Sequence, residues 1–181
     1  MRVLIADDHT LVRRGLHLVL SKLYPDAEVL EASDVEGALR IAATTPEIDL
    51  VLCDLAMPGM EQLRGLQALK QRLPGVPLVI LSANANPDDI VRTIEHGARG
   101  YILKSASDES FRHALSLVLS GEIYLPSDAF LDRQQRWVGT RGGMAEFSAD
   151  NPLSSLTERQ RDVLTLLMAG QSNKEIARNL G

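Results

Sequence analysis

Five short apolar segments, separated by stretches of helical periodicity, constrain the fold more than any other feature of the sequence. These segments are residues 3–6, 27–30, 50–52, 78–81 and 101–103. They are nearly continuous rather than alternating, which is typical of strands buried on both faces of a parallel sheet. Because an amphipathic helical pattern follows each of them, five strand–helix units predict an α/β fold with a doubly wound parallel sheet.

Short motifs mark where the predicted helices begin and end. Ser33 and Glu36 have the spacing of a capping box, and Ser107 precedes two acidic residues that suit a helix N-terminus. Gly97 and Gly121 stand where two helices should stop, because glycine readily takes the left-handed conformation that closes a helix. The predicted apolar face of the first helix consists of Leu11, Val12, Leu16, Val19, Leu20 and Leu23.

The periodicity divides the chain into three parts. Residues 1–122 form one predicted domain, and residues 123–150, where regular periodicity is lost, form a predicted linker. Helical periodicity returns in residues 151–181. There, capping boxes that start at Thr157 and Ser172 predict a helix, a tight turn and a second helix.

Charge and composition limit the classes of function. The chain has a net charge of −5, and residues 1–126 carry 12 basic and 17 acidic side chains, so that part is not a nucleic-acid surface. Residues 151–181 carry a net charge of +1, and any DNA contact is expected there. One cysteine, Cys53, excludes an internal disulfide and suits the cytoplasm, and no segment is long enough to span a membrane.

Side chains that can bind ligands or take part in a reaction stand at the carboxyl ends of four predicted strands. Asp7 and Asp8 follow the first strand, Asp54 ends the third, Ser82 ends the fourth and Lys104 follows the fifth. Ligands bind outside the carboxyl ends of strands in such folds, so we expect these side chains to converge. Each has an ordinary structural explanation on its own, such as a helix cap or a solvated loop lysine. Their joint occurrence at strand ends favours a site.

Three converging carboxylates repel one another, and a hard divalent cation such as Mg²⁺ relieves that repulsion through oxygen ligands. Beside such an ion, Asp54 can attack phosphorus and form an acyl phosphate. Lys104 would supply positive charge, and Ser82 a hydroxyl, for the oxygens of the transferred group. The residues therefore predict Mg²⁺-dependent phosphorylation of Asp54.

The motifs around these residues resemble the receiver domain of two-component response regulators. They are Ile5-Ala6-Asp7-Asp8-His9, Asp54-Leu55-Ala56-Met57-Pro58-Gly59-Met60, Leu81-Ser82-Ala83 and Gly97-Ala98-Arg99-Gly100-Tyr101-Ile102-Leu103-Lys104. Residues 156–160 and 170–177 are similar to the DNA-binding domain of the LuxR/NarL/FixJ branch. The resemblance implies a flavodoxin- and CheY-like receiver, then a linker, then the N-terminal part of a LuxR-type helix-turn-helix domain.

The resemblance also implies residue roles. Asp54 would be converted to 4-aspartylphosphate, with assistance from Lys104 and Ser82. The implied Mg²⁺ ligands are Asp7, Asp8, Asp54 and the backbone carbonyl of Ala56. Ser82 and Tyr101 would form a switch pair, in which Ser82 moves to bond the phosphoryl group and Tyr101 turns inward. For Tyr101, simple packing is an equally weighted alternative.

Two departures from the family pattern lie near this site. Glu61-Gln62 stands where the family usually has Asp-Gly, just after the Pro-Gly turn, which could alter the loop over the site. Ala56 and Asn84 occupy positions that tune dephosphorylation in the family, so the lifetime of the phosphoryl group is left open.

The implied partners are a sensor histidine kinase, and DNA where the helix-turn-helix domain is complete; a homodimer is left open. The family's DNA-binding domain has four helices, and residues 151–181 match the first two. The recognition helix would then lie past Gly181. We expect residues 151–181 to fold poorly alone and not to read DNA sequence by this mode.

The residues allow functions from three classes. The favoured one is a response regulator that accepts a phosphoryl group, hydrolyses it slowly without being a turnover enzyme, and controls transcription. A phosphatase or mutase that uses an aspartyl phosphate usually has a second aspartate two residues after the nucleophile, where this chain has Ala56. A stand-alone receiver acting through protein contacts is the alternative. The chain has no GxxxxGK loop, so ATP use is not expected.

Overall fold

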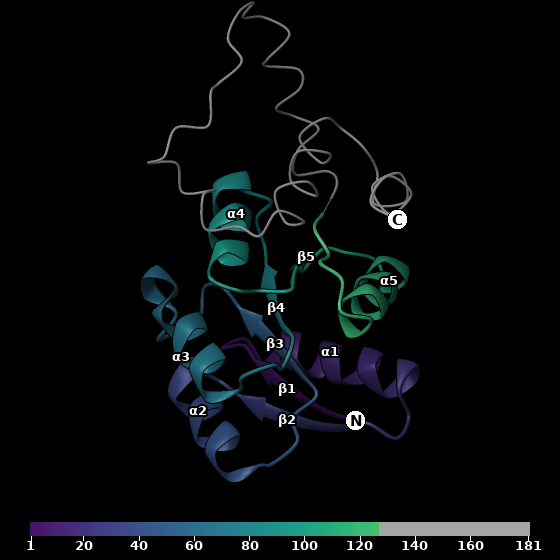
Figure 1. Cartoon of the computed structure of the whole chain (residues 1–181). Coiled ribbons are helices and arrows are strands. Elements are labelled where there is room, and N and C mark those ends of the chain that lie inside the picture. Colours follow the sequence, from purple (N-terminus) through teal and green to yellow (C-terminus); the bar gives the residue numbers. More distant parts are fainter. Residues whose placement is uncertain (127–181) are drawn as a thin grey trace, which may run out of the picture.

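The computed structural model of the chain describes residues 1–126, which form a parallel sheet covered by helices on both faces (Figure 1). The strands are β1 (Arg2–Ala6), β2 (Glu28–Ala32), β3 (Leu50–Asp54), β4 (Leu78–Ser82) and β5 (Gly100–Leu103). Their order in the sheet is β2-β1-β3-β4-β5. The predicted α/β doubly wound fold is confirmed, and every predicted apolar segment overlaps a strand.

The helices between the strands place the crevice of the fold. They are α1 (Thr10–Leu23), α2 (Val35–Thr44), α3 (Arg64–Arg72), α4 (Pro87–Glu95) and α5 (Asp108–Leu119). α1 and α5 pack on one face of the sheet, and α2, α3 and α4 cover the other (Figure 1). Because the chain moves from β1 to β2 on one side and returns to β3 on the other, the crevice lies at the carboxyl ends of β1 and β3.

The central strands are buried on both faces, which explains their continuous apolar runs. Every residue of β3 and β4 is buried. In the strand register, Ala6 pairs with Cys53, Asp54 with Leu81, and Ser82 with Leu103. The carboxyl ends of β1, β3, β4 and β5 therefore come together along one edge.

Local predictions were partly right. Ser107 caps α5 through a bond from the Ser110 amide, and the left-handed Gly97 and Gly121 follow the ends of α4 and α5, as predicted. The capping box at Ser33 is wrong. Asp34 caps α2 instead, accepting a hydrogen bond from the Gly37 amide at 2.6 Å.

The predicted apolar face of α1 needs a correction too. Leu11 is 82% exposed, whereas Leu20 is fully buried. Leu11 lies in the first turn of α1 and belongs to neither core cluster of the sheet. Helical periodicity alone cannot show which turns of a helix contact the sheet.

The chain continues along the sheet edge beyond residue 122. Tyr124 forms a parallel bridge with Gly100, and Leu125 is only 2% exposed. Residues 127–181, which contain most of the predicted linker and all of the predicted helix-turn-helix segment, lie outside the described residues. Among the helices of residues 1–126, none has the length and apolar character needed to cross a membrane.

The segment between β3 and α3 contains backbone conformations that favour glycine. In the short 3₁₀ helix η1 (Glu61–Leu63), Gln62 has φ 53° and ψ 29°, and Leu63 has φ 63°. The left-handed region costs a residue with a Cβ roughly 1–2 kcal/mol. Gln62 stands where the resembled family usually has glycine, so this chain keeps the turn without the residue that suits it best.

We therefore expect Gln62→Gly to raise the free energy of unfolding by about 0.5–1 kcal/mol, since relief of the left-handed strain exceeds the added entropy of the unfolded chain. Urea unfolding followed by circular dichroism measures this difference. Gln67→Gly within α3 is the matched control and should lower stability by about 1 kcal/mol. Equal losses in both variants would contradict the interpretation.

Candidate functional site

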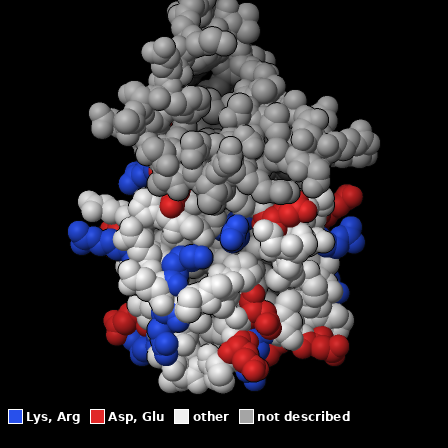
Figure 2. Space-filling model, in the orientation of Figure 1, with Lys and Arg blue, Asp and Glu red and all other residues white. Residues whose placement is uncertain are grey.

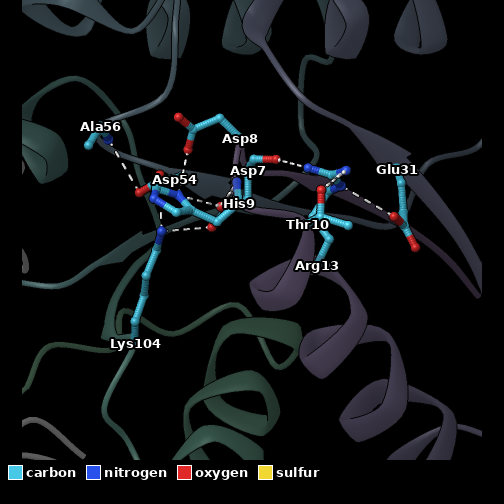
Figure 3. A network of polar contacts seen from close by, with 9 residues as sticks. All are labelled: Asp7, Asp8, His9, Thr10, Arg13, Glu31, Asp54, Ala56 and Lys104. Atoms are coloured by element: carbon cyan, nitrogen blue, oxygen red, sulfur yellow. Dashed lines mark hydrogen bonds and ion pairs between the residues drawn. The ribbon is translucent and has the colours of Figure 1, made fainter.

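Two buried carboxylates form the centre of the site. Asp7 directly follows β1 and is 0% exposed, and Asp54 ends β3 and is 1% exposed. Because β1 and β3 are adjacent in the sheet, their carboxyl ends place the two side chains together at the crevice. Figure 3 shows both carboxylates pointing into one small space. The predicted convergence of these aspartates is confirmed.

Lys104 reaches this pair from the residue after β5. Its Nζ lies 2.8 Å from Asp7 Oδ2 and 3.0 Å from Asp54 Oδ2 (Figure 3). Burial lowers the pKa of Lys104, but its bonds to Asp7 and Asp54 outweigh burial, so the pKa lies above its ordinary value. Lys104 is therefore a fixed ammonium at neutral pH, and the solvated-lysine alternative does not describe it.

The acidic cradle, formed by Asp7, Asp8 and Asp54, has less positive than negative charge. Oδ2 of Asp7 and Oδ2 of Asp54 are buried, and within residues 1–126 no backbone N–H or hydroxyl donates to either oxygen. One ammonium thus faces two carboxylates, with Asp8 beside them. Burial of like charges without full compensation is unfavourable, which is the condition that a bound cation relieves.

Asp8 and His9 form the solvent side of the cradle. His9 Nδ1 lies 2.7 Å from Asp8 Oδ1 and 3.3 Å from Asp7 Oδ1. The side chain of His9 is 63% exposed and that of Asp8 is 37% exposed. The helix-cap alternative for the acidic pair fails, because the N-cap residue of α1 is His9, and Asp7 Oδ1 accepts the His9 N–H rather than an N–H of the first turn.

One atom from each of Asp7, Asp8, His9 and Asp54 can be chosen so that all four lie within 4.8 Å of one another. Carboxylate oxygens at this separation suit a hard divalent cation. Ala56 is adjacent, and its backbone N–H donates to Asp54 Oδ1 at 3.3 Å (Figure 3). The residues present therefore fit a divalent metal ion.

Ser82 and Tyr101 meet at the backbone of one loop residue. Asn84 donates its N–H to Ser82 Oγ at 3.2 Å and accepts a hydrogen bond from the Tyr101 hydroxyl at 2.9 Å. Tyr101 is fully buried, and burial raises the pKa of its hydroxyl. Both residues therefore hold the start of the loop between β4 and α4, and Tyr101 occupies an inward position.

Arg13 is a residue of the site that the sequence did not predict. Its Nη1 donates to the backbone oxygen of Asp7 at 2.6 Å, and its Nε bonds to Glu31 Oε2 at 3.3 Å (Figure 3). Arg13 therefore ties the loop that carries the acidic pair to the end of β2. Its position one helical turn after His9 is the available signal, but the contact with Glu31 depends on the pairing of β1 with β2.

Both ends of the chain match known families. Residues 3–116 match the response regulator receiver domain, and residues 154–181 match the bacterial regulatory proteins of the luxR family. The glycerol metabolism activator of Pseudomonas putida is 39% identical over 181 residues, which cover 99% of this chain and 80% of the relative. The nitrate/nitrite response regulator NarL of Escherichia coli K12 is 35% identical over 179 residues, covering 98% of this chain and 80% of NarL.

Solved structures agree with the fold. A LuxR family DNA-binding response regulator from Silicibacter pomeroyi is 36% identical, with a TM-score of 0.62 over 70% of this chain and 97% of that structure. A LuxR family two-component response regulator from Aurantimonas sp. SI85-9A1 is 27% identical, with a TM-score of 0.65 over 76% of this chain and 97% of that structure.

Proposed function

The chain belongs to the LuxR family of response regulators, which join a receiver domain to a LuxR-type DNA-binding domain, and we propose that its Asp54 is the phosphoacceptor. As a member of this family it is a two-component regulator of transcription rather than a turnover enzyme. The single observation that supports Asp54 is its position: it is buried, bonded to Lys104, and next to the acidic pair.

In the proposed reaction, an Asp54 carboxylate oxygen attacks phosphorus of a phosphohistidine on the partner kinase. The oxygen–phosphorus bond forms as the nitrogen–phosphorus bond breaks, and the electron pair of that bond goes to the imidazole nitrogen. Lys104 offers its ammonium to an oxygen of the transferred group, and Ser82 offers its hydroxyl to another. The product is 4-aspartylphosphate at Asp54, which then hydrolyses slowly.

The proposed cofactor is Mg²⁺, held by Asp7, Asp8, Asp54 and the backbone carbonyl of Ala56. When bound, it neutralises charge on the oxygens in transfer. Support comes from the buried carboxylates of Asp7 and Asp54, for which one ammonium is insufficient compensation.

The proposed switch pair is Ser82 and Tyr101. When Ser82 turns to bond the new phosphoryl group, its bond to the Asn84 amide is lost, and the loop before α4 is released to follow. Tyr101 remains bonded to the Asn84 carbonyl and moves with that loop. A local change of charge at Asp54 thereby reaches the surface around α4 and β5.

DNA contact is assigned to the LuxR-type domain. Basic and acidic side chains are mixed over the visible face of residues 1–126, and those residues have a net charge of −5 (Figure 2). A surface of this kind does not attract a phosphate backbone. The luxR family match at residues 154–181 also disfavours the alternative of a stand-alone receiver. A sensor histidine kinase is the partner that the receiver domain implies, and we propose a cytoplasmic location.

Phosphorylation itself is tested by incubating the full chain with acetyl phosphate and Mg²⁺ and measuring its intact mass. We expect the mass of one phosphoryl group to be added, and none when Mg²⁺ is removed by chelation. Unchanged mass under both conditions would count against the proposal.

Asp8→Ala is expected to remove the response to Mg²⁺, because it deletes the carboxylate that closes the cradle on its solvent side. At a Mg²⁺ concentration about 100 times the dissociation constant, the parent chain should gain about 2.7 kcal/mol of stability. At the same concentration the variant should gain almost none, as judged by thermal unfolding. Asp26→Ala, at the opposite edge of the sheet, should respond like the parent. An undiminished shift in Asp8→Ala would rule out Asp8 as a ligand.

A further inference from the structure

We propose that His9 is an additional, nitrogen ligand of the metal site, so that this cradle binds Zn²⁺ through an imidazole as well as Mg²⁺ through oxygens. The inference rests on the proposed function insofar as the same carboxylates hold both ions. It goes further by assigning a residue and a second class of cation, those first-row metals that prefer imidazole.

The position of His9 Nδ1 beside two carboxylates suits a ligand of a common ion. For metal–ligand bonds of about 2.1 Å, neighbouring ligand atoms lie roughly 3.0–3.4 Å apart. His9 Nδ1 lies 3.3 Å from Asp7 Oδ1, within this range, and 2.7 Å from Asp8 Oδ1, a hydrogen-bond distance that a shared cation would lengthen. In Figure 3 the imidazole ring lies among the three carboxylates rather than away from them. Little movement is needed for these atoms to share one cation.

A second feature that points to a cation is the pair of buried oxygens behind His9. Asp7 Oδ2 and Asp54 Oδ2 receive no N–H or hydroxyl donor from residues 1–126 other than the shared Lys104 ammonium. The half-open side, formed by Asp8 and His9, gives an ion a path from solvent. The site thus lacks positive charge and is open to solvent on one side, so a cation can enter it.

The backbone of His9 holds its ring at the site. The His9 N–H donates to Asp7 Oδ1 at 2.8 Å, and His9 is the N-cap residue of α1. Its Cβ therefore leaves from a fixed point beside the acidic pair. The chain's other histidines, His17, His96 and His113, lie outside the four-residue cluster.

The ligand types separate the two cations. Mg²⁺ prefers oxygen and gains little from an imidazole, whereas Zn²⁺ binds imidazole and carboxylate readily. Removal of His9 should therefore weaken Zn²⁺ binding more than Mg²⁺ binding. Removal of Asp8 should weaken both.

The test compares the parent chain with His9→Ala, Asp8→Ala and the control His96→Ala, which removes a ring at the end of α4. Calorimetric titration with Zn²⁺ should show at least about a tenfold loss of affinity in His9→Ala. Titration with Mg²⁺ should show less than about a twofold change in that variant. Asp8→Ala should lose affinity for both ions, and His96→Ala for neither.

Nitrogen-15 NMR of the histidine rings supplies a readout independent of affinity. On addition of Zn²⁺, the Nδ1 resonance of His9 should shift while those of the other histidines remain in place. An unmoved His9 resonance, or equal losses of Zn²⁺ and Mg²⁺ affinity in His9→Ala, would overturn the proposal.

The proposed function is judged separately. Uptake of one phosphoryl group by the parent chain from acetyl phosphate with Mg²⁺ tests it, without any change at His9. Should the parent chain fail to take it up while the His9 resonance shifts, phosphorylation is wrong and the zinc ligand stands. Normal phosphorylation together with an unmoved His9 resonance would disprove the proposal that His9 binds zinc and leave the proposed function standing.

Discussion

Asp54→Asn is expected to abolish uptake of the phosphoryl group. The amide has almost the same shape as the carboxylate, but it lacks the negative oxygen that attacks phosphorus. Asp54 ends β3 and is 1% exposed, so an isosteric change preserves the packing around it. Intact-mass measurement after incubation with acetyl phosphate and Mg²⁺ should show one added group on the parent chain and none on the variant.

Asp26→Asn is the matched control for this experiment. It makes the same chemical change at an exposed position before β2, at the opposite edge of the sheet, and should leave uptake unchanged. Folding of Asp54→Asn is checked by circular dichroism, and we expect a stability equal to or above that of the parent, because one of the repelling carboxylates is gone. Equal uptake by Asp54→Asn and the parent would disprove the assignment of the acceptor.

Lys104→Ala is expected to slow phosphorylation by about 10²- to 10³-fold, the usual cost of losing one preorganised group that stabilises transition-state charge. The ammonium lies 2.8 Å and 3.0 Å from oxygens of Asp7 and Asp54, so it is already in place to receive the phosphoryl oxygens. The rate is measured from the time course of mass gain with acetyl phosphate at saturating Mg²⁺.

The same change should also lower the free energy of unfolding by about 3 kcal/mol without Mg²⁺, since two buried carboxylates then lose their shared partner. That loss leaves the fold intact, and Mg²⁺ should restore part of it. Lys22→Ala in the last turn of α1 controls for removal of a lysine and should alter neither rate nor stability appreciably. A near-normal rate in Lys104→Ala would show that its charge is not used in transfer.

The sheet was predictable because burial of β3 and β4 on both faces leaves a direct trace in the sequence. Helix boundaries were less so. Ser33 and Asp34 are adjacent and both can cap, and only the backbone path decides that the Asp34 carboxylate meets the Gly37 amide. Similarly, the exposure of Leu11 depends on which turns of α1 pack against the sheet.

Within the site, the predicted aspartates and Lys104 converge because the strands run parallel, so that their carboxyl ends share one edge of the sheet. The contributions of His9 and Arg13 were not predictable in the same way. Each depends on the direction in which α1 leaves the loop after β1, and Arg13 also depends on Glu31 being brought near by β2. The absence of the family's usual glycine at Gln62 marked this turn as unusual in the sequence, but only the structure shows that Gln62 has a positive φ.

The bridge at Tyr124 attaches the chain that follows α5 to the edge of the sheet. The amide of Tyr101 donates to the Tyr124 carbonyl at 2.9 Å, and the amide of Tyr124 donates to the Arg99 carbonyl at 3.1 Å. Tyr101, the aromatic residue of the proposed switch pair, is thus hydrogen-bonded directly to the backbone of Tyr124. Loss of these two bonds would release residues 123–126 from β5, and hydrogen exchange at the Tyr101 amide would register that release first.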